Sequence, residues 1–406
     1  MSKNFSFKAK KILVVSTKAP FPSRDGVTVP ITSYVKGLRA LGHELDLLIL
    51  DDLMNGGSFH EDNDLNFVNI ESLKVSRFRG VDLLKFIFKK RYPYFAALKI
   101  PREAYCESFD RSYDWIWVSP RRALGPVLQL KANGHWPDAK IIGAVNDIES
   151  LRLEKMSSQR LKELSSPLKS LILKLKARVL RPLEINLLNG CRVIQVQTTA
   201  EQRWIEAHAN ELIGRTIVLS NGVDEKFFSV SLERNQPSLV FVGAIDGMYA
   251  ERVVWFINRV WPRLRECCSQ AKMTVIGRVK DEDMVAFFQE NAVEYIHFVD
   301  CPEDLYSRYS ILVAPIFKGY GLINKVLQSM AAGTLVVGDR SAFNGIEGFV
   351  DGMHGLIAET EIDFIEQIVR VCESETYELG LRTQARMLVE ETFGWNKRIT
   401  EISGML

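Results

Sequence analysis

Short apolar runs alternate with segments of helical periodicity along most of this 406-residue chain, and no other feature constrains its fold as strongly. The apolar run Ile12–Val15, for example, is followed by a segment at about 28–41 whose apolar residues lie on one helical stripe. Strands that alternate with helices imply parallel sheets built from right-handed βαβ units. The predicted strands lie at about 12–15, 45–50, 115–118, 141–145, 193–197, 217–219, 239–242, 273–276, 295–298, 311–313 and 335–337, and the predicted helices include 28–41, 250–265, 282–290 and 395–406.

The alternation forms two halves, each long enough for a sheet of its own. Between them the stretch 225–237 is polar and poorly periodic, which is typical of a linker. We therefore expect an α/β protein with two Rossmann-like domains that face each other across a cleft, residues 1–224 and 238–394, followed by a last helix at 395–406. A ligand is expected outside the carboxyl ends of the strands, where two such domains meet.

Composition and cysteine usage exclude several classes of protein. The hydrophobic share of 47% and the charged share of 25% are ordinary for a globular protein, and no apolar run approaches the roughly 18 residues that span a membrane. The run Ile12–Val15 is also too short for the core of a signal peptide, so we expect a cytoplasmic protein. The six cysteines and six histidines form no metal-binding pattern, so we expect no metal and no cofactor.

Positive charge is concentrated in the first half of the chain. Residues 1–200 contain 32 Lys and Arg against 20 Asp and Glu, a net charge of +12, whereas residues 201–406 contain 20 against 30, a net charge of −10. The basic segments Leu151–Arg181 and Phe78–Leu98 both combine apolar residues with Lys and Arg. Either segment could be an amphipathic helix on the inner face of an anionic membrane. The alternative is a helix that packs its apolar residues on the core and exposes a basic face.

One segment, Ala314–Gly333, has the pattern of a strand, a glycine loop and a helix. Gly319 and Gly321 leave the backbone bare, and we expect the helix to begin near Gly321 or Leu322. Its first N–H groups and its dipole favour a phosphate, and Lys325 lies one turn further on. The alternative is a simple strand–loop–helix corner with a solvated lysine, because short glycine motifs are common.

This segment closely resembles the donor-binding signature of the group 1, or family 4, glycosyltransferases, which are retaining enzymes with the GT-B fold. The matching residues run Gly319-Tyr-Gly321-Leu-Ile-Asn-Lys325-Val-Leu-Gln328-Ser-Met-Ala-Ala-Gly333 and precede the strand Leu335-Val-Val337. Further resemblances lie in the family's order at Ile12–Val15, Pro20–Gly26, Asn221–Asp224 with Phe227-Phe228, and Phe241–Gly243. The resemblance covers nearly the whole chain, and it implies that the helix 395–406 packs back on the first domain.

The resemblance assigns the binding of a nucleotide-diphosphate sugar to the second domain. Two positions depart from the family pattern: Ala244 replaces a usual Arg after Gly243, and Gln328 replaces a Glu whose carboxylate binds both ribose hydroxyls. Because Gln accepts hydrogen bonds with one end only, we expect weaker donor binding. Lys325, helped by Arg278, would neutralise the diphosphate without a metal ion. The expected donor-binding residues are Gly243, Arg278, Gly319, Tyr320, Gly321, Leu322, Ile323, Lys325 and Gln328.

The first domain is expected to bind the acceptor. The segment Asn146–Arg152 resembles the family motif Asp-x-x-Ser-x-Arg near the reaction centre, and we expect Asp147 to be catalytic, together with Lys325, by orienting or deprotonating the acceptor hydroxyl. Asp147 could equally cap the helix that follows it. Arg121 follows a predicted strand and could bind an anionic acceptor. The expected acceptor-side residues are Asp25, Gly26, Arg121, Ser150 and Arg152.

These features together predict a retaining glycosyltransferase of the hexosyltransferase type. It would transfer a sugar from a nucleotide-diphosphate sugar to a hydroxyl of a saccharide or glycolipid, in the synthesis of the cell envelope or of an exopolysaccharide. Its partners would be the donor, the acceptor and, through the basic first half, a membrane surface. A first alternative, motivated by Gln328 and Ala244, is a catalytically weak or inactive GT-B protein that acts as a nucleotide-binding scaffold or partner subunit. An enzyme acting on nucleic acid is the weakest of the three hypotheses, and we do not expect nucleic acid as a partner.

Overall fold

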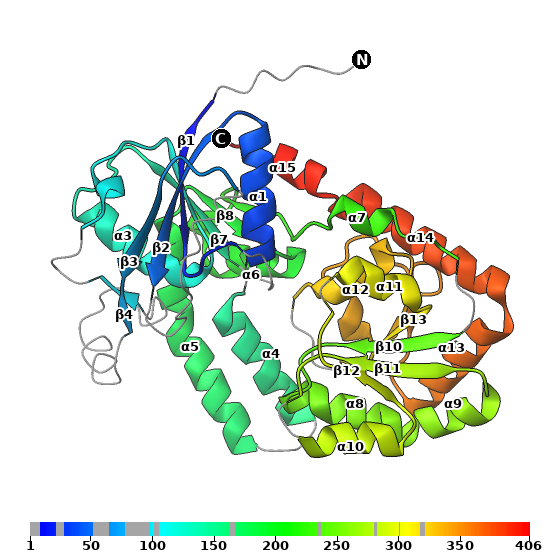
Figure 1. The fold of residues 1–406 in the computed structure, drawn as a ribbon. Helices are drawn as coiled ribbons and strands as arrows, with labels where there is room; N and C mark the ends of the chain where they lie inside the picture. The colour runs from blue at the N-terminus through cyan, green and yellow to red at the C-terminus, as the bar shows by residue number, and fades with distance from the viewer. Residues whose placement is uncertain are drawn as a thin grey trace. The chain divides into compact units, whose positions relative to one another are not determined.

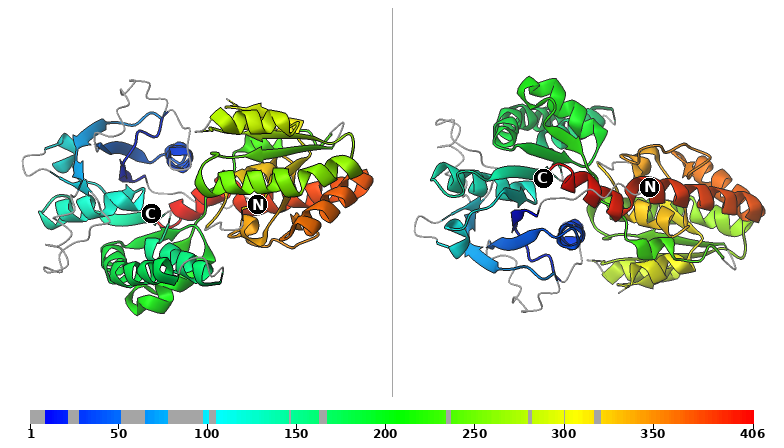
Figure 2. Two further views of the ribbon diagram at one scale, coloured as in Figure 1. Left: turned by 90° about the horizontal axis from the view of Figure 1, so that it is seen from below. Right: turned by 90° about the horizontal axis from the view of Figure 1, so that it is seen from above.

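The computed structural model describes residues 9–21, 28–51, 65–77, 98–100, 105–145, 147–162, 167–233, 237–279, 282–299, 301–316 and 321–406. The chain forms two compact units: unit 1 contains the residues up to Ser220 together with Arg398–Leu406, and unit 2 contains Asn221–Lys397. Each unit is an α/β structure with one main parallel sheet (Figures 1 and 2). No helix in this described part of the chain is both long enough and apolar enough to cross a membrane.

Unit 1 has a seven-stranded parallel sheet in the order β3-β2-β1-β6-β7-β8-β9. Its strands are β1 (Lys11–Ser16), β2 (Glu44–Asp51), β3 (Ile70–Lys74), β6 (Trp115–Val118), β7 (Lys140–Val145), β8 (Val193–Val196) and β9 (Thr216–Val218), and β4 (Ser76–Arg77) and β5 (Leu98–Lys99) form a separate antiparallel pair. The central strands β1, β6 and β7 are buried along nearly their whole length, as a parallel sheet covered on both faces requires. The sequence predicts every strand of this main sheet except β3.

The helices of unit 1 cover both faces of its sheet. Leu13 of β1 belongs to the core that includes residues of α3, α5 and α6. Trp117 of β6 lies on the opposite face and packs edge-to-face on Tyr34 of α1, with ring centroids 5.2 Å apart. The helices are α1 (Thr28–Ala40), α3 (Leu124–Ala132), α4 (Glu149–Lys162), α5 (Pro167–Asn189) and α6 (Thr199–His208).

The last residues of the chain complete unit 1. The helix α15 (Trp395–Ser403) begins in unit 2 and continues past residue 397 into unit 1. Its Ile399 packs so closely on α1 that a Cβ at Gly37 would lie 2.1 Å from the Ile399 side chain. Beyond the helix, the Leu406 carbonyl oxygen accepts a hydrogen bond from Trp115 Nε1 at 3.1 Å. Residues from both ends of the chain therefore share one folded unit.

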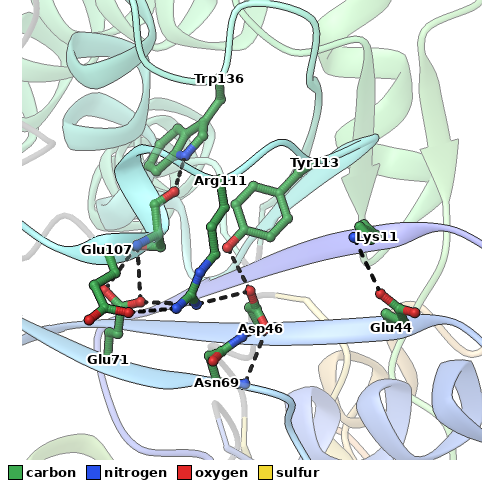
Figure 3. Close-up of polar contacts among 10 residues, drawn as sticks. Lys11, Glu44, Asp46, Asn69, Glu71, Glu107, Arg111, Tyr113 and Trp136 are labelled. Atoms are coloured by element: carbon green, nitrogen blue, oxygen red, sulfur yellow. Dashed lines mark hydrogen bonds and ion pairs between the residues drawn. The ribbon is translucent and has the colours of Figure 1, made fainter.

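A partly buried polar cluster lies at the amino end of the unit 1 sheet (Figure 3). Asp46 of β2 accepts hydrogen bonds from Tyr113 Oη at 2.7 Å and from Asn69 Nδ2 at 2.8 Å. Arg111 Nη1 lies 3.5 Å from the Asp46 carboxylate and 3.3 Å from that of Glu71. Because Asn69 precedes β3 and Tyr113 precedes β6, the cluster joins the beginnings of three strands. This structural role leaves the opposite, carboxyl edge of the sheet for a ligand.

Unit 2 has a six-stranded parallel sheet in the order β12-β11-β10-β13-β14-β15. Its strands are β10 (Ser238–Val242), β11 (Lys272–Ile276), β12 (Glu294–Ile296), β13 (Ile311–Ala314), β14 (Leu335–Gly338) and β15 (Leu356–Ile357). Its helices are α7 (Glu225–Phe228), α8 (Gly247–Arg259), α9 (Trp261–Cys267), α10 (Glu282–Glu290), α11 (Pro302–Arg308), α12 (Asn324–Ala331), α13 (Glu361–Glu373) and α14 (Glu375–Phe393). The sequence predicts all of these strands except β15.

Successive residues of the unit 2 strands face two separate cores. In β10, Leu239 and Phe241 belong to the core that includes residues of α8, α9, α10 and α13. Val240, between them, belongs to the core that includes residues of α7, α11, α12 and α14. Since strand residues point alternately to opposite faces, helices cover both faces of this sheet, as in a Rossmann-like domain.

Several boundaries differ from those expected from the sequence. The first unit boundary lies after Ser220 and the second before Arg398, and the expected linker 225–237 contains α7, whose Phe227 is buried in a core of unit 2. The single helix expected at 250–265 was wrong: α8 and α9 are separate helices, because Pro262 would break the hydrogen bonding of a continuous helix. The basic segment 78–97 lies outside the described residues.

Candidate functional site

The strand order of each sheet contains one switch point, where a ligand is expected to bind at the carboxyl edge. In unit 2, β11 and β12 lie on one side of β10, whereas the later strand β13 lies on its other side. In unit 1, β2 and β3 lie on one side of β1, whereas β6 lies on the other. The loops after β10 and β13 therefore flank the switch point of unit 2, and those after β1 and β6 flank the switch point of unit 1.

Two glycines bring the ends of β10 and β11 into backbone contact. Gly277 has φ +146°, and a Cβ there would lie 1.8 Å from the Gly243 carbonyl oxygen. Gly243 N donates to the Ile276 carbonyl oxygen at 2.9 Å, and Gly277 N donates to the Ile296 carbonyl oxygen at 3.0 Å. Only glycine permits this approach, so the carboxyl edge beside the switch point consists of bare backbone that a ligand can closely approach.

Lys325 reaches from α12 to the end of β10. Its Nζ donates to the Val242 carbonyl oxygen at 2.6 Å and would lie 2.8 Å from a Cβ at Gly243. The ring centroids of Phe241 and Tyr249 lie 5.0 Å and 4.4 Å from the same Nζ. Burial alone lowers the pKa of this amine to about 8, so no described carboxylate compensates its charge. Below pH 8 the structure therefore holds an uncompensated cation at the switch point.

The helix α12 begins later than the sequence predicts. Its first residue is Asn324, rather than Gly321 or Leu322. Gly321 has φ +80° and Ile323 is extended, so neither has the backbone conformation of a right-handed helix. Leu322 and Ile323 are partly buried and pack against the core that includes α12. The Ile323 side chain provides no cap, and the Val326 amide donates to the Ile323 carbonyl oxygen at 2.9 Å. The amides of Asn324 and Lys325 are therefore the ones that could face an anion beside the Lys325 amine.

The structure describes only some of the remaining donor-side residues. Gln328 lies one turn into α12 and is partly buried, and Arg278 is exposed at the end of β11. Four expected site residues lie outside the described part of the chain, namely Asp25, Gly26, Gly319 and Tyr320. Within the described ranges, no group of three or more His, Cys, Asp and Glu side chains could hold a metal ion.

In unit 1, the buried carboxylate of Glu184 organises the chain after β6 and β7. Glu184, on α5, accepts hydrogen bonds from Glu149 N at 2.8 Å and from Ser150 N at 2.9 Å, and it forms an ion pair with Arg121. Ser150 is fully buried, and its hydroxyl also donates to Glu184. Burial lowers the pKa of the Arg121 guanidinium to about 10, so this group remains charged at neutral pH. Arg121 and Ser150 thus belong to one buried network that fixes the start of α4.

Asp147 lies between β7 and α4, where it is exposed. The first amides of α4 donate to Glu184, so Asp147 is not the cap that the sequence allowed as an alternative. Partial burial of its carboxyl raises the pKa of Asp147 above the ordinary value, and Arg152 and Arg121 oppose this shift. Arg152 forms a two-pronged ion pair with Glu149, with distances of 2.6 Å and 3.0 Å. A carboxylate with a raised pKa is a better base, which suits an acceptor hydroxyl.

Three residues with a clear role at these edges are missing from the sequence prediction. Phe241 and Tyr249 enclose the Lys325 amine, and Glu184 joins Arg121 to α4. Tyr249 lies in the first turn of α8, directly after the Gly243 loop. Its place in the sequence, just after a strand end at the switch point, could have identified it as a site residue. Glu184 could have been noticed as an acidic residue just after the basic segment Leu151–Arg181. Phe241 is indistinguishable in the sequence from an ordinary core residue.

Solved structures match this architecture along nearly the whole chain. Sucrose-phosphate synthase from Thermosynechococcus elongatus is 15% identical, with a TM-score of 0.65 and 98% of each chain covered. HepE from Anabaena, in complex with UDP, is 14% identical, with a TM-score of 0.65, 98% of this chain and 100% of that chain covered. TarM from S. aureus is 11% identical, with a TM-score of 0.64 and 99% of each chain covered. The predicted fold class is therefore confirmed as GT-B.

A comparison with protein families adds a match that lies within unit 2. Residues 236–374 match the model of the family described as glycosyl transferases group 1, and no curated protein sequence matches the chain significantly. The matched range contains the Gly243–Gly277 contact and Lys325. Within a chain that has the GT-B fold, residues 236–374 of unit 2 are therefore similar to the group 1 glycosyltransferases.

Proposed function

We propose that the protein is a retaining, metal-independent glycosyltransferase that transfers a hexosyl group from a nucleotide-diphosphate sugar to a hydroxyl of a saccharide or glycolipid. The observation that carries the proposal is the Lys325 amine beside the bare backbone of Gly243 and Gly277, at the switch point of unit 2. The family match over these residues and the UDP bound to HepE support a nucleotide diphosphate as the ligand. The proposed setting is the synthesis of the cell envelope or of an exopolysaccharide.

The chemistry of donor cleavage fits the environment of Lys325. As the bond between the sugar C1 and the diphosphate oxygen breaks, negative charge develops on the leaving phosphate. The Lys325 ammonium stabilises this charge, and the Val242 carbonyl and two aromatic rings already hold it in position. A fixed cation in a partly desolvated site needs little reorganisation during the reaction, which is why it contributes to the rate.

On the acceptor side, the proposed step is a front-side displacement. The acceptor oxygen forms its bond to C1 on the face from which the diphosphate leaves, and the acceptor proton passes to a phosphate oxygen. Asp147, exposed after β7 and with a raised pKa, would orient the acceptor hydroxyl. Arg121 is largely buried and paired with Glu184, so it would hold the start of α4 in place beside Asp147 rather than bind the acceptor itself.

The test is a calorimetric screen of UDP, GDP, ADP, CDP and TDP against the wild type and two variants. Lys325→Ala should lower the affinity for the preferred diphosphate by about 1.5–3 kcal/mol, or roughly tenfold to more than a hundredfold. Lys272→Ala, which removes an exposed lysine at the opposite end of β11, should leave it unchanged. If no diphosphate binds, or if the two variants bind alike, the proposed donor site is wrong.

A nucleotide-binding scaffold is the second candidate, and Gln328 and Ala244 favour it because both remove charge that the family uses on the donor. Hydrolysis of a panel of nucleotide sugars separates the two functions. Release of free sugar from one donor, lost in Lys325→Ala, supports the enzyme. Tight diphosphate binding without turnover of any donor, in the presence of a range of saccharide and glycolipid acceptors, supports the scaffold.

A further inference from the structure

The helix α5 exposes a continuous apolar stripe. Its five members are Leu168, Leu171, Ile172, Leu175 and Val179, whose exposed fractions are 69%, 54%, 44%, 50% and 54%. At about 100° per residue, these positions fall on one side of the helix. A run of neighbouring exposed aliphatic side chains marks a surface that contacts another apolar phase or molecule.

The opposite side of α5 is the side that packs. Ser170 and Ala177 are buried there, and Ser170 Oγ donates to the Ser157 carbonyl oxygen of α4 at 2.8 Å. Further along, Arg181 forms an ion pair with Glu154 of α4. Figure 1 shows the two helices side by side. The alternative expectation for this segment, a helix with its apolar residues on the core and a basic exposed face, is therefore wrong for the stripe, which points away from α4.

Basic side chains flank the stripe on both sides. Counting at about 100° per residue, Lys169 and Lys176 lie along one edge of it, and Lys174 and Arg178 lie along the other. All four residues are exposed. An apolar stripe between two cationic edges is the pattern of a helix that lies in the plane of a membrane, with its aliphatic residues among the acyl chains and its cations at the headgroups.

We propose that α5 docks the protein on an anionic lipid surface through this stripe. Charge decides between this occupant and a second copy of the chain. Two copies packed stripe to stripe would bring basic edges against basic edges, which repel, whereas anionic headgroups neutralise both edges at once. The net charge of +12 over residues 1–200 also attracts the protein to an anionic surface, at longer range. The proposal does not depend on the proposed function, because it concerns a different surface.

The test is vesicle co-sedimentation of the full chain without any nucleotide sugar. We expect binding to vesicles of phosphatidylcholine mixed with phosphatidylglycerol, at least about tenfold weaker binding to pure phosphatidylcholine, and release at high salt. Because no donor or acceptor is present, failure here is independent of failure of the diphosphate screen.

Two triple variants separate the apolar and electrostatic contributions. Leu171→Gln, Leu175→Gln and Val179→Gln together should abolish sedimentation with the anionic vesicles. Their matched control is Ile362→Gln, Leu379→Gln and Met387→Gln, which replaces equally exposed apolar residues of unit 2 and should bind as the wild type does. All these positions are exposed and Gln is a good helix former, so folding, checked by thermal unfolding, should be retained.

The charge variant combines Lys174→Gln, Lys176→Gln and Arg178→Gln. Affinity for the anionic vesicles should fall by about fivefold for each charge removed. The control Arg263→Gln, Arg265→Gln and Lys272→Gln removes three exposed charges from unit 2 and should have no effect.

Three outcomes would overturn the proposal. They are no binding of the wild type to anionic vesicles, equal binding of the stripe variant and its control, and concentration-dependent dimerisation that the stripe variant abolishes while vesicles are not bound. The last outcome would assign the stripe to a second copy of the chain.

Discussion

The Lys325 amine lies between two aromatic rings and a carbonyl oxygen, and this environment controls its charge. Burial lowers its pKa to about 8, so near pH 8 the free protein contains both the ammonium and the neutral amine. A bound diphosphate adds negative charge beside the amine, and an opposite charge raises the pKa of a lysine. The binding of a nucleotide diphosphate should therefore be coupled to the uptake of a proton.

The first prediction measures this coupling. At pH 8, titration of the preferred nucleotide diphosphate in buffers with different ionisation enthalpies should show an uptake of about half a proton, and affinity should fall as the pH rises above 8. Lys325→Arg, whose side chain stays charged, should show neither effect. Identical heats in all buffers for the wild type would mean that the diphosphate does not approach this amine.

The second prediction concerns Gln328, at the position where the family has Glu. A carboxylate can accept hydrogen bonds from both ribose hydroxyls, whereas an amide can accept only with its oxygen. Gln328→Glu should therefore leave diphosphate affinity unchanged or raise it by up to about tenfold, and Gln328→Ala should lower it. Calorimetry of the three proteins decides: unchanged affinity in both variants would show that this side chain does not contact the nucleotide.

Some residues of the candidate site could be predicted from the sequence, whereas others could not. Lys325 and Gly243 could be placed near each other because a motif resemblance fixes both, and the structure brings them together. Phe241 and Tyr249 could not, since the side on which an aromatic ring packs depends on contacts between distant elements. The shared role of Arg121 and Ser150 was invisible for the same reason: it depends on Glu184, which belongs to another helix.

At the scale of elements, the contact between the ends of β10 and β11 gives the third prediction. Gly277→Ala would force a Cβ onto the Gly243 carbonyl oxygen, 1.8 Å away, and should both destabilise unit 2 and abolish diphosphate binding. Gly380→Ala is the matched control, because Gly380 lies in α14 with nothing within 4 Å of the added Cβ.

The control should stabilise the protein by about 0.5–1 kcal/mol, since alanine is the better helix former. Thermal unfolding and calorimetry measure the two effects separately. Wild-type diphosphate affinity in Gly277→Ala would show that the glycine contact is dispensable for the site.

Elements with strong local signals were predicted well. The helix at 282–290 has the predicted bounds, and the capping-box residues Thr198 and Glu201 predict the start of α6, where the structure has the reciprocal hydrogen bonds. The edge strand β3 was missed because it has one buried residue in its five, which leaves no apolar pattern to detect. The start of α12 was predicted too early because Gly321 has a left-handed backbone conformation that the sequence permits but does not reveal.

At the scale of the whole molecule, unit 1 depends on residues from the end of the chain. Ile402 is 1% exposed, and Ile399 packs against Gly37 of α1. The fourth prediction is that deletion of residues 398–406 destabilises unit 1 by several kcal/mol, because burial of each such side chain contributes about 1.5–3 kcal/mol. Unit 2 should keep its stability.

Hydrogen exchange distinguishes the two units. In the deletion variant, protection should fall in α1 and β6 and persist in β10 and β13. Met405→Ala, which trims a side chain that is 38% exposed, should leave protection unchanged in both. Uniform loss of protection across β10 and β13 as well would show that the two units do not unfold separately.

The division into two α/β halves could be predicted from the alternation of strands and helices, which recurs on both sides of the polar stretch 225–237. The sharing of residues 398–406 with unit 1 was expected only through the family resemblance. Nothing in the periodicity of a short amphipathic helix says which of two cores it completes, because both cores accept the same kind of apolar side chain.

Because α15 crosses the unit boundary, the two units become complete at different times during synthesis of the chain. Unit 2 is made of one uninterrupted stretch, whereas unit 1 lacks its last helical turns until residues 398–406 have been synthesised. Most of unit 1 leaves the ribosome first but cannot complete its fold until residues 398–406 follow. Unit 2 can therefore reach its native state earlier. For that interval the surface of α1 that Ile399 covers in the folded protein stays exposed in the nascent chain.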